Sequence, residues 1–396
     1  MILDVLFWLL LFILFYTYAG YALVLWVLVR LKKLFVNAKD HSTSADYEPD
    51  VCLFVTAYNE KDYIKQKVEN AFSLDYPKEK IQYLWITDGS DDGSHEMLKK
   101  FGNLEVYHQP ERKGKMHAMN RGMKFVKAPI VIFSDSNTIL GQQSIREIVK
   151  CFSMQNVGCV AGEKRIIQQD EEAAAGAGEG LYWKMESWIK QKDWELNSAV
   201  GAVGELFAIR TALFDDVETD TLLDDFMISL RIAQKGFKIA YAPNAYAKET
   251  ASLNVKEELK RKVRIAAGGI QTIARLKGLL NPIKNGILSW QYFSHKVLRW
   301  ALAPPALFLL FLVNLLLVAI NNSWESSGFY TLALYIQLFC YVAAVLGWYF
   351  ENRKVRLKLL FVPYYFVMIN YASLLGMRRY FTKQQSVNWE KSQRAG

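Results

Sequence analysis

The sequence predicts a mostly parallel α/β domain carried between membrane-spanning helices, and two observations lead to this fold class. From residue 51 to residue 280, short runs of β-branched and aromatic residues alternate with amphipathic segments, which is typical of a parallel sheet covered by helices. Apolar stretches that are long enough to cross a bilayer flank this region on both sides. We therefore expect a multi-pass membrane protein with one large water-exposed domain.

Composition supports this class and argues against others. The chain has 396 residues, of which 52% are hydrophobic, and a formal net charge of +9. Its basic residues cluster beside the apolar stretches, so the charge suits a membrane surface, and no nucleic acid is expected as a partner. The four cysteines have neither zinc-site spacing nor the pattern of a disulfide framework, which fits a reducing compartment.

The first apolar stretch, residues 5–29, predicts a transmembrane helix over residues 1–30. It is too long for a signal peptide, lacks a basic start, and is followed by no small-residue cleavage site. Arg30 and two lysines come directly after it, so the positive-inside rule places the N-terminus outside and the following domain in the cytoplasm. Residues 31–50 are expected to form a polar linker.

The first half of the domain reads as strands separated by helices. We expect strands over residues 51–56, 81–87, 104–107 and 130–133, and helices over residues 61–73 and 115–126. Three of these strands end near Thr56, Thr87 and Ser134, and polar, turn-forming residues follow each of them. Since ligands bind beyond the carboxyl ends of parallel strands, the sequence predicts a site at this edge.

The second half of the domain has a more mixed pattern. We expect strands over residues 157–167 and 237–242, helices over residues 182–194, 223–234 and 256–280, and a glycine-punctuated loop that leads into an apolar segment over residues 201–210. Asp224 and Asp225 stand at the start of one of these helices, where the helix dipole favours carboxylates.

The C-terminal part predicts an interfacial amphipathic segment, a membrane region and a basic tail, over residues 281–301, 302–377 and 378–396. Within the membrane region, residues 302–320 and 329–350 are clear spans, and the loop between them lacks Lys and Arg, which suits the outside. If residues 359–377 also cross, the basic tail lies outside, against the positive-inside rule. This third segment is therefore expected either to span or to lie in the interface.

Several residues at the predicted edge could carry chemistry, each with a plainer alternative. Asp135 stands where a divalent ion could be held against a substrate phosphate, although Asp also commonly caps helices. Asp88, in the string DGSDDGS, could accept hydrogen bonds from a nucleoside or could simply form a turn. Lys115 follows a glycine and suits a pyrophosphate, although such a string also forms a solvated turn. A carboxylate at Asp225 could act as a general base on a hydroxyl or could simply cap its helix.

Taken in order, these strings resemble the membrane-bound family 2 glycosyltransferases, the group that includes the cellulose, hyaluronan, chitin and poly-N-acetylglucosamine synthases. The matching strings are TAYNE at 56–60, DYP at 75–77, DGSDDGS at 88–94, residues 113–122, SDSNT at 134–138, residues 204–210, the pair Asp224-Asp225, and WEK at 389–391. The resemblance implies a GT-A fold, which is a Rossmann-like mixed sheet with helices on both faces. It also implies a nucleotide-diphospho-sugar donor, inversion at the anomeric carbon, and Mg²⁺ or Mn²⁺ as the cofactor.

The resemblance also implies roles for individual residues. Donor binding is expected at Thr56, Tyr58, Glu60, Asp88, Lys115, Asp135 and Arg264; the metal at Asp135 and Asn137; the catalytic base at Asp225; and the acceptor side at Asp224, Gly204 and Glu205. The sequence departs from the family in two places. Asn137 replaces the second carboxylate of the DxD motif, although an amide oxygen can still bind a hard cation. The QxxRW motif reads RKVRI at 261–265, without the Gln and without the Trp that helps to stack the acceptor in the processive synthases.

The expected function is therefore transfer of a sugar, from a UDP-sugar by analogy with the family, to a glycan or lipid-linked acceptor at the cytoplasmic face of the inner membrane, in polysaccharide or cell-envelope glycan synthesis. One alternative is non-processive transfer of a single sugar to a lipid acceptor. A remoter one is a catalytically inactive scaffold or transporter with the same fold. The expected partners are the donor, the acceptor, membrane lipids and, for an exported glycan, accessory export proteins.

Overall fold

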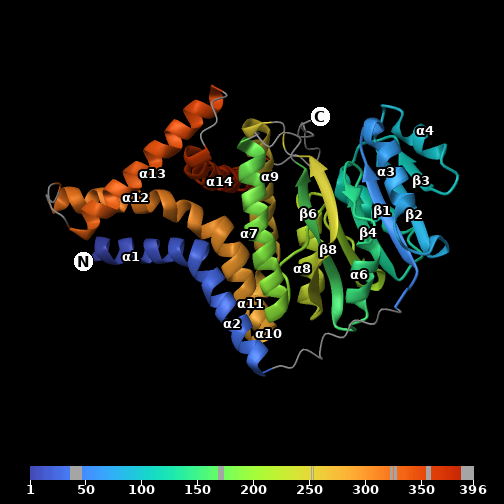
Figure 1. The fold of residues 1–396 in the computed structure, drawn as a ribbon, viewed down its shortest axis with the longest axis horizontal. Coiled ribbons are helices and arrows are strands. Elements are labelled where there is room, and N and C mark those ends of the chain that lie inside the picture. Colours follow the sequence, from blue (N-terminus) through green and yellow to red (C-terminus); the bar gives the residue numbers. More distant parts are fainter. Residues whose placement is uncertain are drawn as a thin grey trace.

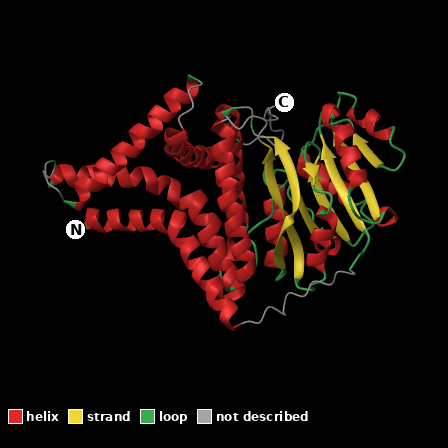
Figure 2. Cartoon of the chain, viewed as in Figure 1, coloured by secondary structure: helices red, strands yellow, loops and turns green. Residues whose placement is uncertain are grey.

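The computed structural model describes residues 1–35, 47–167, 174–250, 252, 254–321, 324, 328–353 and 358–384. Figure 1 shows two parts, a lobe built around a sheet and an arm of long helices that carries the N-terminus. Figure 2 shows the strands gathered in the lobe, with helices alone in the arm. The middle of the predicted linker, residues 36–46, and the string WEK at 389–391 lie outside the described residues.

The described strands form one eight-stranded sheet in the order β3-β2-β1-β4-β7-β6-β8-β5. The strands are β1 (Val51–Ala57), β2 (Ile81–Asp88), β3 (Glu105–Gln109), β4 (Ile130–Asp135), β5 (Ile139–Leu140), β6 (Val157–Ile167), β7 (Leu206–Arg210) and β8 (Lys238–Thr250). Strands β1 to β4 are parallel to one another, β7 is antiparallel to both of its neighbours, and β8 is parallel to β6. The expectation of a mixed sheet with helices is confirmed.

Helices cover both faces of the sheet because its central strands are apolar on both faces. In β1, Cys52 and Phe54 point into one apolar cluster, whereas Val51, Leu53 and Val55 point into the other. The first cluster is covered by α5 and α8, and the second by α3 and α6. The helices of this lobe are α3 (Lys61–Ser73), α4 (Ser94–Lys99), α5 (Lys115–Met123), α6 (Ser144–Phe152), α7 (Ala174–Leu196), α8 (Asp224–Gln234) and α9 (Val255–Arg275), with short 3₁₀ turns η3 (Lys78–Lys80), η4 (Thr211–Leu213) and η5 (Lys277–Leu280).

Strand β8 is longer than the predicted strand over residues 237–242. The string Pro243-Asn244 looks like a turn in the sequence, but the structure carries it within the strand. The pairing with β6 shifts register between Ala161 and Glu163, whose partners are Tyr241 and Tyr246, so the extra residues of β8 are absorbed in an irregularity. This extension brings the end of β8 to the same edge as the ends of β1, β2 and β4.

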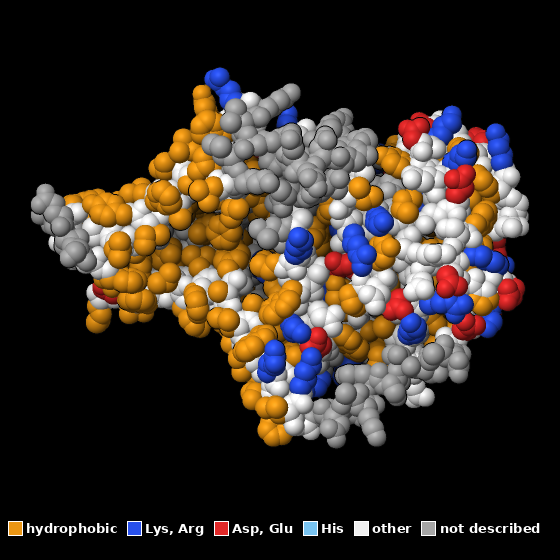
Figure 3. All heavy atoms as spheres, viewed as in Figure 1, with side chains coloured by type: hydrophobic (Ala, Val, Ile, Leu, Met, Phe, Trp, Pro, Cys, Tyr) orange, Lys and Arg blue, Asp and Glu red, His pale blue; other side chains and the backbone are white. Residues whose placement is uncertain are grey.

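Among the described residues, four helical segments are long and apolar enough to cross a membrane: Ile2–Phe35, Ile287–Ile320, Phe329–Glu351 and Leu359–Phe381. Their elements are α1 (Ile2–Phe15), the π-helical η1 (Tyr16–Gly20), α2 (Tyr21–Phe35), α11 (Ile287–Tyr292), the π-helical η6 (Phe293–Leu302), α12 (Ala303–Ile320), α13 (Phe329–Asn352) and α14 (Lys358–Phe381). The short helix α10 (Pro282–Asn285) directly precedes α11. Figure 3 shows apolar side chains over the arm and charged ones over the sheet lobe. This division fits an arm in lipid and a lobe in water.

Residues 287–320 form one helical run, so the segment predicted as interfacial continues directly into the span that follows it. Its polar side chains are buried against α7: Lys296 Nζ lies 2.5 Å and Arg299 2.8 Å from Glu186, and His295 lies 2.7 Å from Asp193. Placement of residues 281–301 at a membrane surface stays a prediction.

Helix α14 packs along α9 of the sheet lobe. The Tyr365 hydroxyl donates a hydrogen bond of 3.2 Å to Glu258. Gly376 approaches so closely that a Cβ there would lie 2.6 Å from the Cβ of Ala266. The third C-terminal segment is thus attached to the water-exposed lobe along much of its length.

Candidate active site

The strand directions gather the predicted site residues at one edge of the sheet. Thr56 and Asp135 are direct neighbours at the ends of β1 and β4. Because β7 runs the opposite way, it begins where β4 ends, with Leu206 opposite Ser134. The preceding residues, Gly204 and Glu205, are therefore beside the end of β4.

A cavity of about 370 Å³ opens at this edge. Every predicted site residue lines it: Thr56, Tyr58, Glu60, Asp88, Lys115, Asp135, Asn137, Gly204, Glu205, Asp224, Asp225 and Arg264. Residues that are up to two hundred positions apart in the sequence thus face a common space. The assignment of a role to each of them stays a prediction.

Lys115 lies at the centre of this cavity, at the start of α5. Its Nζ donates a hydrogen bond of 2.8 Å to Asp135 Oδ1 and lies 3.1 Å from Asp224 Oδ2. Burial lowers the pKa of Lys115, but the carboxylates of Asp135 and Asp224 outweigh this effect and hold the pKa above its ordinary value. The group is therefore a permanent cation between two acids.

Asp88 has a structural contact in addition to its predicted role. Its carboxylate accepts hydrogen bonds from the backbone N–H groups of Lys113 at 3.1 Å and Gly114 at 2.7 Å, which fixes the loop that leads into α5. Beside it, the Arg112 guanidinium lies 3.9 Å from the centroid of the Tyr58 ring. Sequence reasoning missed Arg112, although a flat surface of this kind suits a nucleoside base.

Gly89 makes this arrangement possible. Its φ is +68°, and a Cβ there would lie 2.6 Å from the Cβ of Arg112. Only glycine lets the DGS turn after β2 adopt this backbone conformation so close to the Arg112 loop.

Asp135 and Asn137 both face the cavity and fit a divalent cation only in part. Among the residues that the structure describes, no group of three or more His, Cys, Asp or Glu could hold a metal alone. Magnesium is commonly bound by one or two carboxylates together with substrate phosphates. One carboxylate and one amide at the end of β4 fit such a shared site, completed by a diphosphate.

A buried lysine, which the sequence analysis missed, supports this loop from behind. Lys67 of α3 is fully buried and donates hydrogen bonds of 2.7 Å to Ser134 Oγ and 2.8 Å to the Thr138 carbonyl. Burial lowers its pKa to about 7, although the charge of Asp135 opposes the shift. A signal was present, because Lys67 occupies the apolar face of its helix between Ile64 and Val68.

Asp225 stands at the start of α8 and faces Gly204. A Cβ at Gly204 would lie 3.7 Å from the Asp225 carboxyl carbon and 4.0 Å from Lys115 Nζ. Burial raises the pKa of Asp225 to about 7, and the charge of Asp224 adds to the effect. A carboxylate with a pKa near neutrality can take up a proton from a hydroxyl and release it again.

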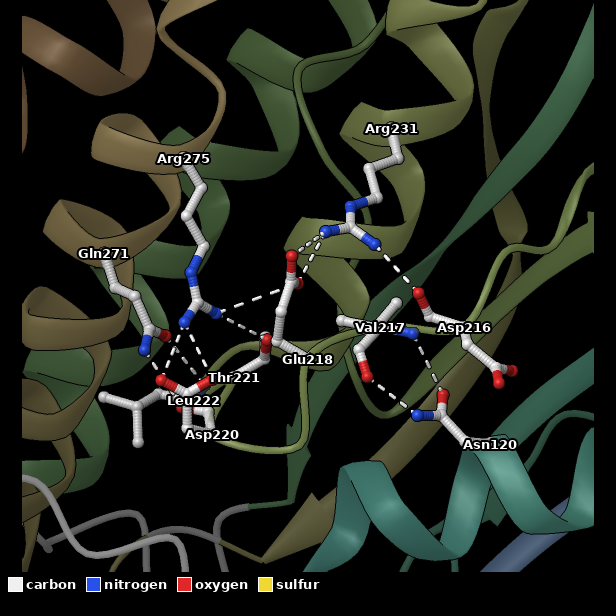
Figure 4. A network of polar contacts seen from close by, with 10 residues as sticks. All are labelled: Asn120, Asp216, Val217, Glu218, Asp220, Thr221, Leu222, Arg231, Gln271 and Arg275. Carbon is white, nitrogen blue, oxygen red and sulfur yellow. Dashed lines mark hydrogen bonds and ion pairs between the residues drawn. The ribbon is translucent and has the colours of Figure 1, made fainter.

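Polar contacts from three helices hold the loop before this acid, as Figure 4 shows. On α9, Gln271 contacts Asp220 O at 2.9 Å and Leu222 N at 3.0 Å. Arg275 binds the Asp220 carboxylate at 2.7 Å. Further hydrogen-bonded pairs in this network are Arg275 with Thr221, Arg231 of α8 with Glu218 and Asp216, and Asn120 of α5 with Val217. The position of the acid pair therefore depends on this network.

Arg264 of α9 lines the cavity from the side opposite the sheet. Burial lowers its pKa, with a further contribution from Arg261, while Asp224, Asp225 and Asp135 attract its charge. The guanidinium is therefore close enough to the acids to act on an anion between them, even though the Gln and Trp of the family motif are absent.

Glu205 is part of a buried ion-pair system. Lys164 of β6 lies 2.5 Å from Glu205 and also contacts Glu249 of β8. Burial raises the pKa of Glu205, but Lys164 outweighs it and holds the pKa well below the usual range. Glu205 is therefore a fixed negative charge on the cavity wall, and sequence reasoning missed Lys164, its ion-pair partner, and Glu249, the second acid that Lys164 contacts.

Comparison with known proteins identifies the family and the fold. The sequence profile described as glycosyltransferase like family 2 matches residues 49–268. The poly-beta-1,6-N-acetyl-D-glucosamine synthase of Staphylococcus aureus is 26% identical over 246 residues, which are 60% of this chain and 58% of that protein. The synthase of the same name from Staphylococcus epidermidis is 22% identical over 271 residues, 64% of each chain. The similarity thus spans about three fifths of the length of these relatives.

Among solved structures, a mannosyltransferase from Pyrobaculum calidifontis in complex with GDP-Man and Mn²⁺ is similar with a TM-score of 0.70. The two chains are 20% identical, and the similarity covers 97% of this chain and 100% of the other. At this identity the likeness shows the fold alone. That likeness includes the helical arm as well as the sheet lobe.

Proposed function

Since the chain belongs to the glycosyltransferase like family 2 and has a GT-A fold, we propose that this glycosyltransferase inverts the sugar that it transfers from a nucleotide-diphospho-sugar to a glycan or lipid-linked acceptor. The observation that carries the proposal is the position of Asp225. Its carboxylate, with a pKa raised to about 7, shares a cavity with the Lys115–Asp135 pair. Transfer with inversion requires a base for the acceptor hydroxyl and a group that binds the donor diphosphate, both facing one cavity.

The proposed reaction is a single in-line displacement at the anomeric carbon of the donor sugar. Asp225 takes the proton of the acceptor hydroxyl, whose oxygen forms a bond to the anomeric carbon. The bond from that carbon to the diphosphate oxygen breaks on the opposite side, and its electron pair leaves with the nucleoside diphosphate. Lys115 and Arg264 stabilise the negative charge that develops there.

For the metal, we propose Mg²⁺ or Mn²⁺ held by Asp135 and Asn137 together with the donor diphosphate. Such an ion supplies charge neutralisation at the leaving group. The partial fit of the two side chains supports a shared site, and a neighbour with the same fold was solved with Mn²⁺. For the donor, a UDP-sugar is our first expectation from the family resemblance, and the GDP-Man complex of that neighbour makes GDP-sugars the comparison to include.

We further propose that the sheet lobe lies at the cytoplasmic face of the inner membrane. The basic end of the first span supports this placement, and it has a second role in docking the lobe. Lys32 Nζ donates hydrogen bonds of 2.9 Å and 2.8 Å to the carbonyls of Glu195 and Leu196 at the end of α7, and Lys33 lies 2.8 Å from the Glu195 carboxylate. These contacts attach the lobe to the base of the helical arm.

The decisive experiment is to incubate the purified full chain with Mn²⁺ and a panel of radiolabelled UDP- and GDP-sugars, together with membrane lipid extract, and to size the product. A long glycan supports polysaccharide synthesis, as in the named relatives. A lipid carrying one sugar supports single transfer, which the Ile at position 265, in place of the stacking Trp, favours. Absence of nucleotide release with every donor contradicts the proposal and leaves the inactive scaffold or transporter.

A further inference from the structure

Trp183, Lys190 and Lys262 also line the cavity, and Lys164, whose side chain is fully buried, lies near the same Trp183 ring without lining the cavity. The ammonium groups of Lys164, Lys190 and Lys262 lie 5.3, 5.6 and 6.0 Å from the centroid of the Trp183 ring. They come from β6, α7 and α9, so three elements that are distant in sequence place cations around one indole ring. We call these four residues the Trp183 cluster.

Lys190 differs from the other two lysines because it has no acidic partner. Lys164 is paired with Glu205, and Lys262 lies 3.6 Å from Glu258. Lys190 is only 3% exposed and lines the cavity, and no carboxylate of a described residue is within ion-pair distance of it. An ammonium group that is buried without an anion is costly. Within the part of the chain that the structure describes, Lys190 therefore lacks a negative charge that a ligand would supply.

The order of the strands separates this cluster from the donor diphosphate. Asp135 ends β4, and Lys164 is on β6, two strands further along the same edge, or about 10 Å at the usual strand spacing. Asp88, at the predicted nucleoside end, is on β2 in the opposite direction. A Cβ at Gly204 would lie 3.7 Å from the Asp225 carboxyl carbon, and the next residue, Glu205, binds Lys164. The cluster is thus on the acceptor side of the proposed base.

The same end of the cavity leads to apolar helices. Phe366 and Ile369 of α14 and Tyr18 of η1 line it, and all three belong to segments apolar enough to cross a membrane. Tyr18 donates a hydrogen bond of 2.5 Å to Asn370 of α14, so these two segments meet beside the cavity. A lipid chain in this part of the cavity would therefore contact side chains of both segments.

We propose that the Trp183 cluster binds the phosphate group of a lipid-linked sugar acceptor, whose hydroxyl then reaches Asp225. This inference rests on the proposed function and narrows its acceptor to lipids that carry a phosphate next to the reacting sugar. Ammonium groups bind phosphate as point charges, and the two that line the cavity, Lys190 and Lys262, would compensate for its desolvation. A glycan without phosphate would leave Lys190 unpaired.

The test measures binding of farnesyl phosphate to the full-length protein in detergent, with UDP, GDP and Mn²⁺ present in excess so that the donor site is filled. Farnesol and inorganic phosphate are the two comparison probes. We expect farnesyl phosphate to bind at least about tenfold more tightly than either, because charge and apolar chain both contribute. Equal affinity for farnesol would show that the phosphate group is not recognised and would overturn the phosphate site. Equal affinity for inorganic phosphate would show that the apolar chain is not recognised and would overturn the claim that the ligand is a lipid.

Variants of Lys190 then test whether this residue binds the phosphate group. Lys190→Gln should weaken farnesyl phosphate binding about 10- to 100-fold, and Lys190→Arg, which keeps the charge, should restore most of it. Lys184→Gln is the matched control, because Lys184 is an exposed lysine on the same helix. Unchanged binding in Lys190→Gln would refute the proposal. A failure of the proposed function is distinguishable, because nucleotide release would then be absent while the Lys190-dependent binding remained.

Discussion

Lys115 Nζ lies 2.8 Å from Asp135 and 3.1 Å from Asp224, so one ammonium group links the end of β4 to the start of α8. The two acids belong to different halves of the lobe and would repel each other without this cation. In the proposed reaction, the same ammonium group also stabilises the donor diphosphate as it gains charge. The proposal thus gives Lys115 a structural task before the donor binds and an electrostatic task afterwards.

Replacing Lys115 by Met should lower kcat/KM by about 10²- to 10³-fold, as the loss of one group that stabilises a developing anion usually does. Steady-state kinetics with the preferred donor would measure the effect. Lys124→Met is the control, because Lys124 is exposed at the end of the same helix. Full activity in Lys115→Met would exclude the residue from the leaving-group site.

Asp225→Asn should reduce turnover by about 10²- to 10⁴-fold with donor binding retained, since only the general base is lost. In the wild type, the pKa of about 7 means that the base is protonated in acid. The value of kcat/KM should therefore rise about tenfold per pH unit below that value and level off above it. A pH profile that is flat from pH 5 to pH 8 would contradict this assignment.

Asp135→Ala should abolish metal-dependent binding of the donor, because Asp135 is the only carboxylate of the SDSNT string. Titration of a UDP- or GDP-sugar with and without Mn²⁺, followed by EDTA, would show this. The converse variant, Asn137→Asp, restores a second carboxylate and should lower the Mn²⁺ concentration needed for half-maximal binding. Identical Mn²⁺ dependence in all three proteins would refute the metal site.

Gln271→Leu removes both hydrogen bonds from α9 to the loop before the acid pair. We expect kcat to fall while the KM for the donor stays nearly unchanged, since the donor contacts are elsewhere. Thermal unfolding should also show a loss of about 1–3 kcal/mol from the buried groups left unpaired. Lys277→Ala, an exposed neighbour, should change neither quantity. A rise in KM without a change in kcat would mean that the loop serves the donor instead.

Helix α14 packs along α9, and we therefore expect the residues that follow it to be on the same side of the membrane as the sheet lobe. A cysteine introduced at position 383, in a background with Cys151→Ser and Cys340→Ser that keeps only the buried Cys52 and Cys159, should react with an impermeant maleimide only when the lobe is also accessible. A cysteine at position 61 on the exposed start of α3 provides the comparison. Labelling of position 383 from the opposite side would establish that α14 crosses the bilayer.

The sequence was sufficient for features that depend on neighbouring residues. The helix over residues 61–73 and the strand over residues 157–167 have the predicted bounds, because hydrophobic periodicity and turn residues define such elements locally. The position of Asp135 at one edge of the sheet was predicted from the rule that ligands bind beyond the carboxyl ends of parallel strands. The family resemblance then predicted the other residues of the site. These predictions needed no knowledge of the packing.

Features that depend on distant partners were missed. Lys164, Trp183 and Lys190 have no motif of their own and become a cluster only when β6, α7 and α9 meet. The length of β8 depends on an irregular pairing with β6 that tolerates Pro243. Periodicity also could not show that Asp88 binds the backbone of residues 113 and 114, because that contact joins two loops.

The reversed direction of β7 has a consequence for how this enzyme can diversify. Ser134 and Leu206 pair in one backbone ladder, so the proposed donor loop and the start of the proposed acceptor side keep a fixed separation. Another wall of the cavity is helical, with α7, α9 and α14 contributing side chains that no ladder restrains. Under the proposed function, residues on these helices can be exchanged to change the acceptor while the proposed reaction centre on the sheet stays the same.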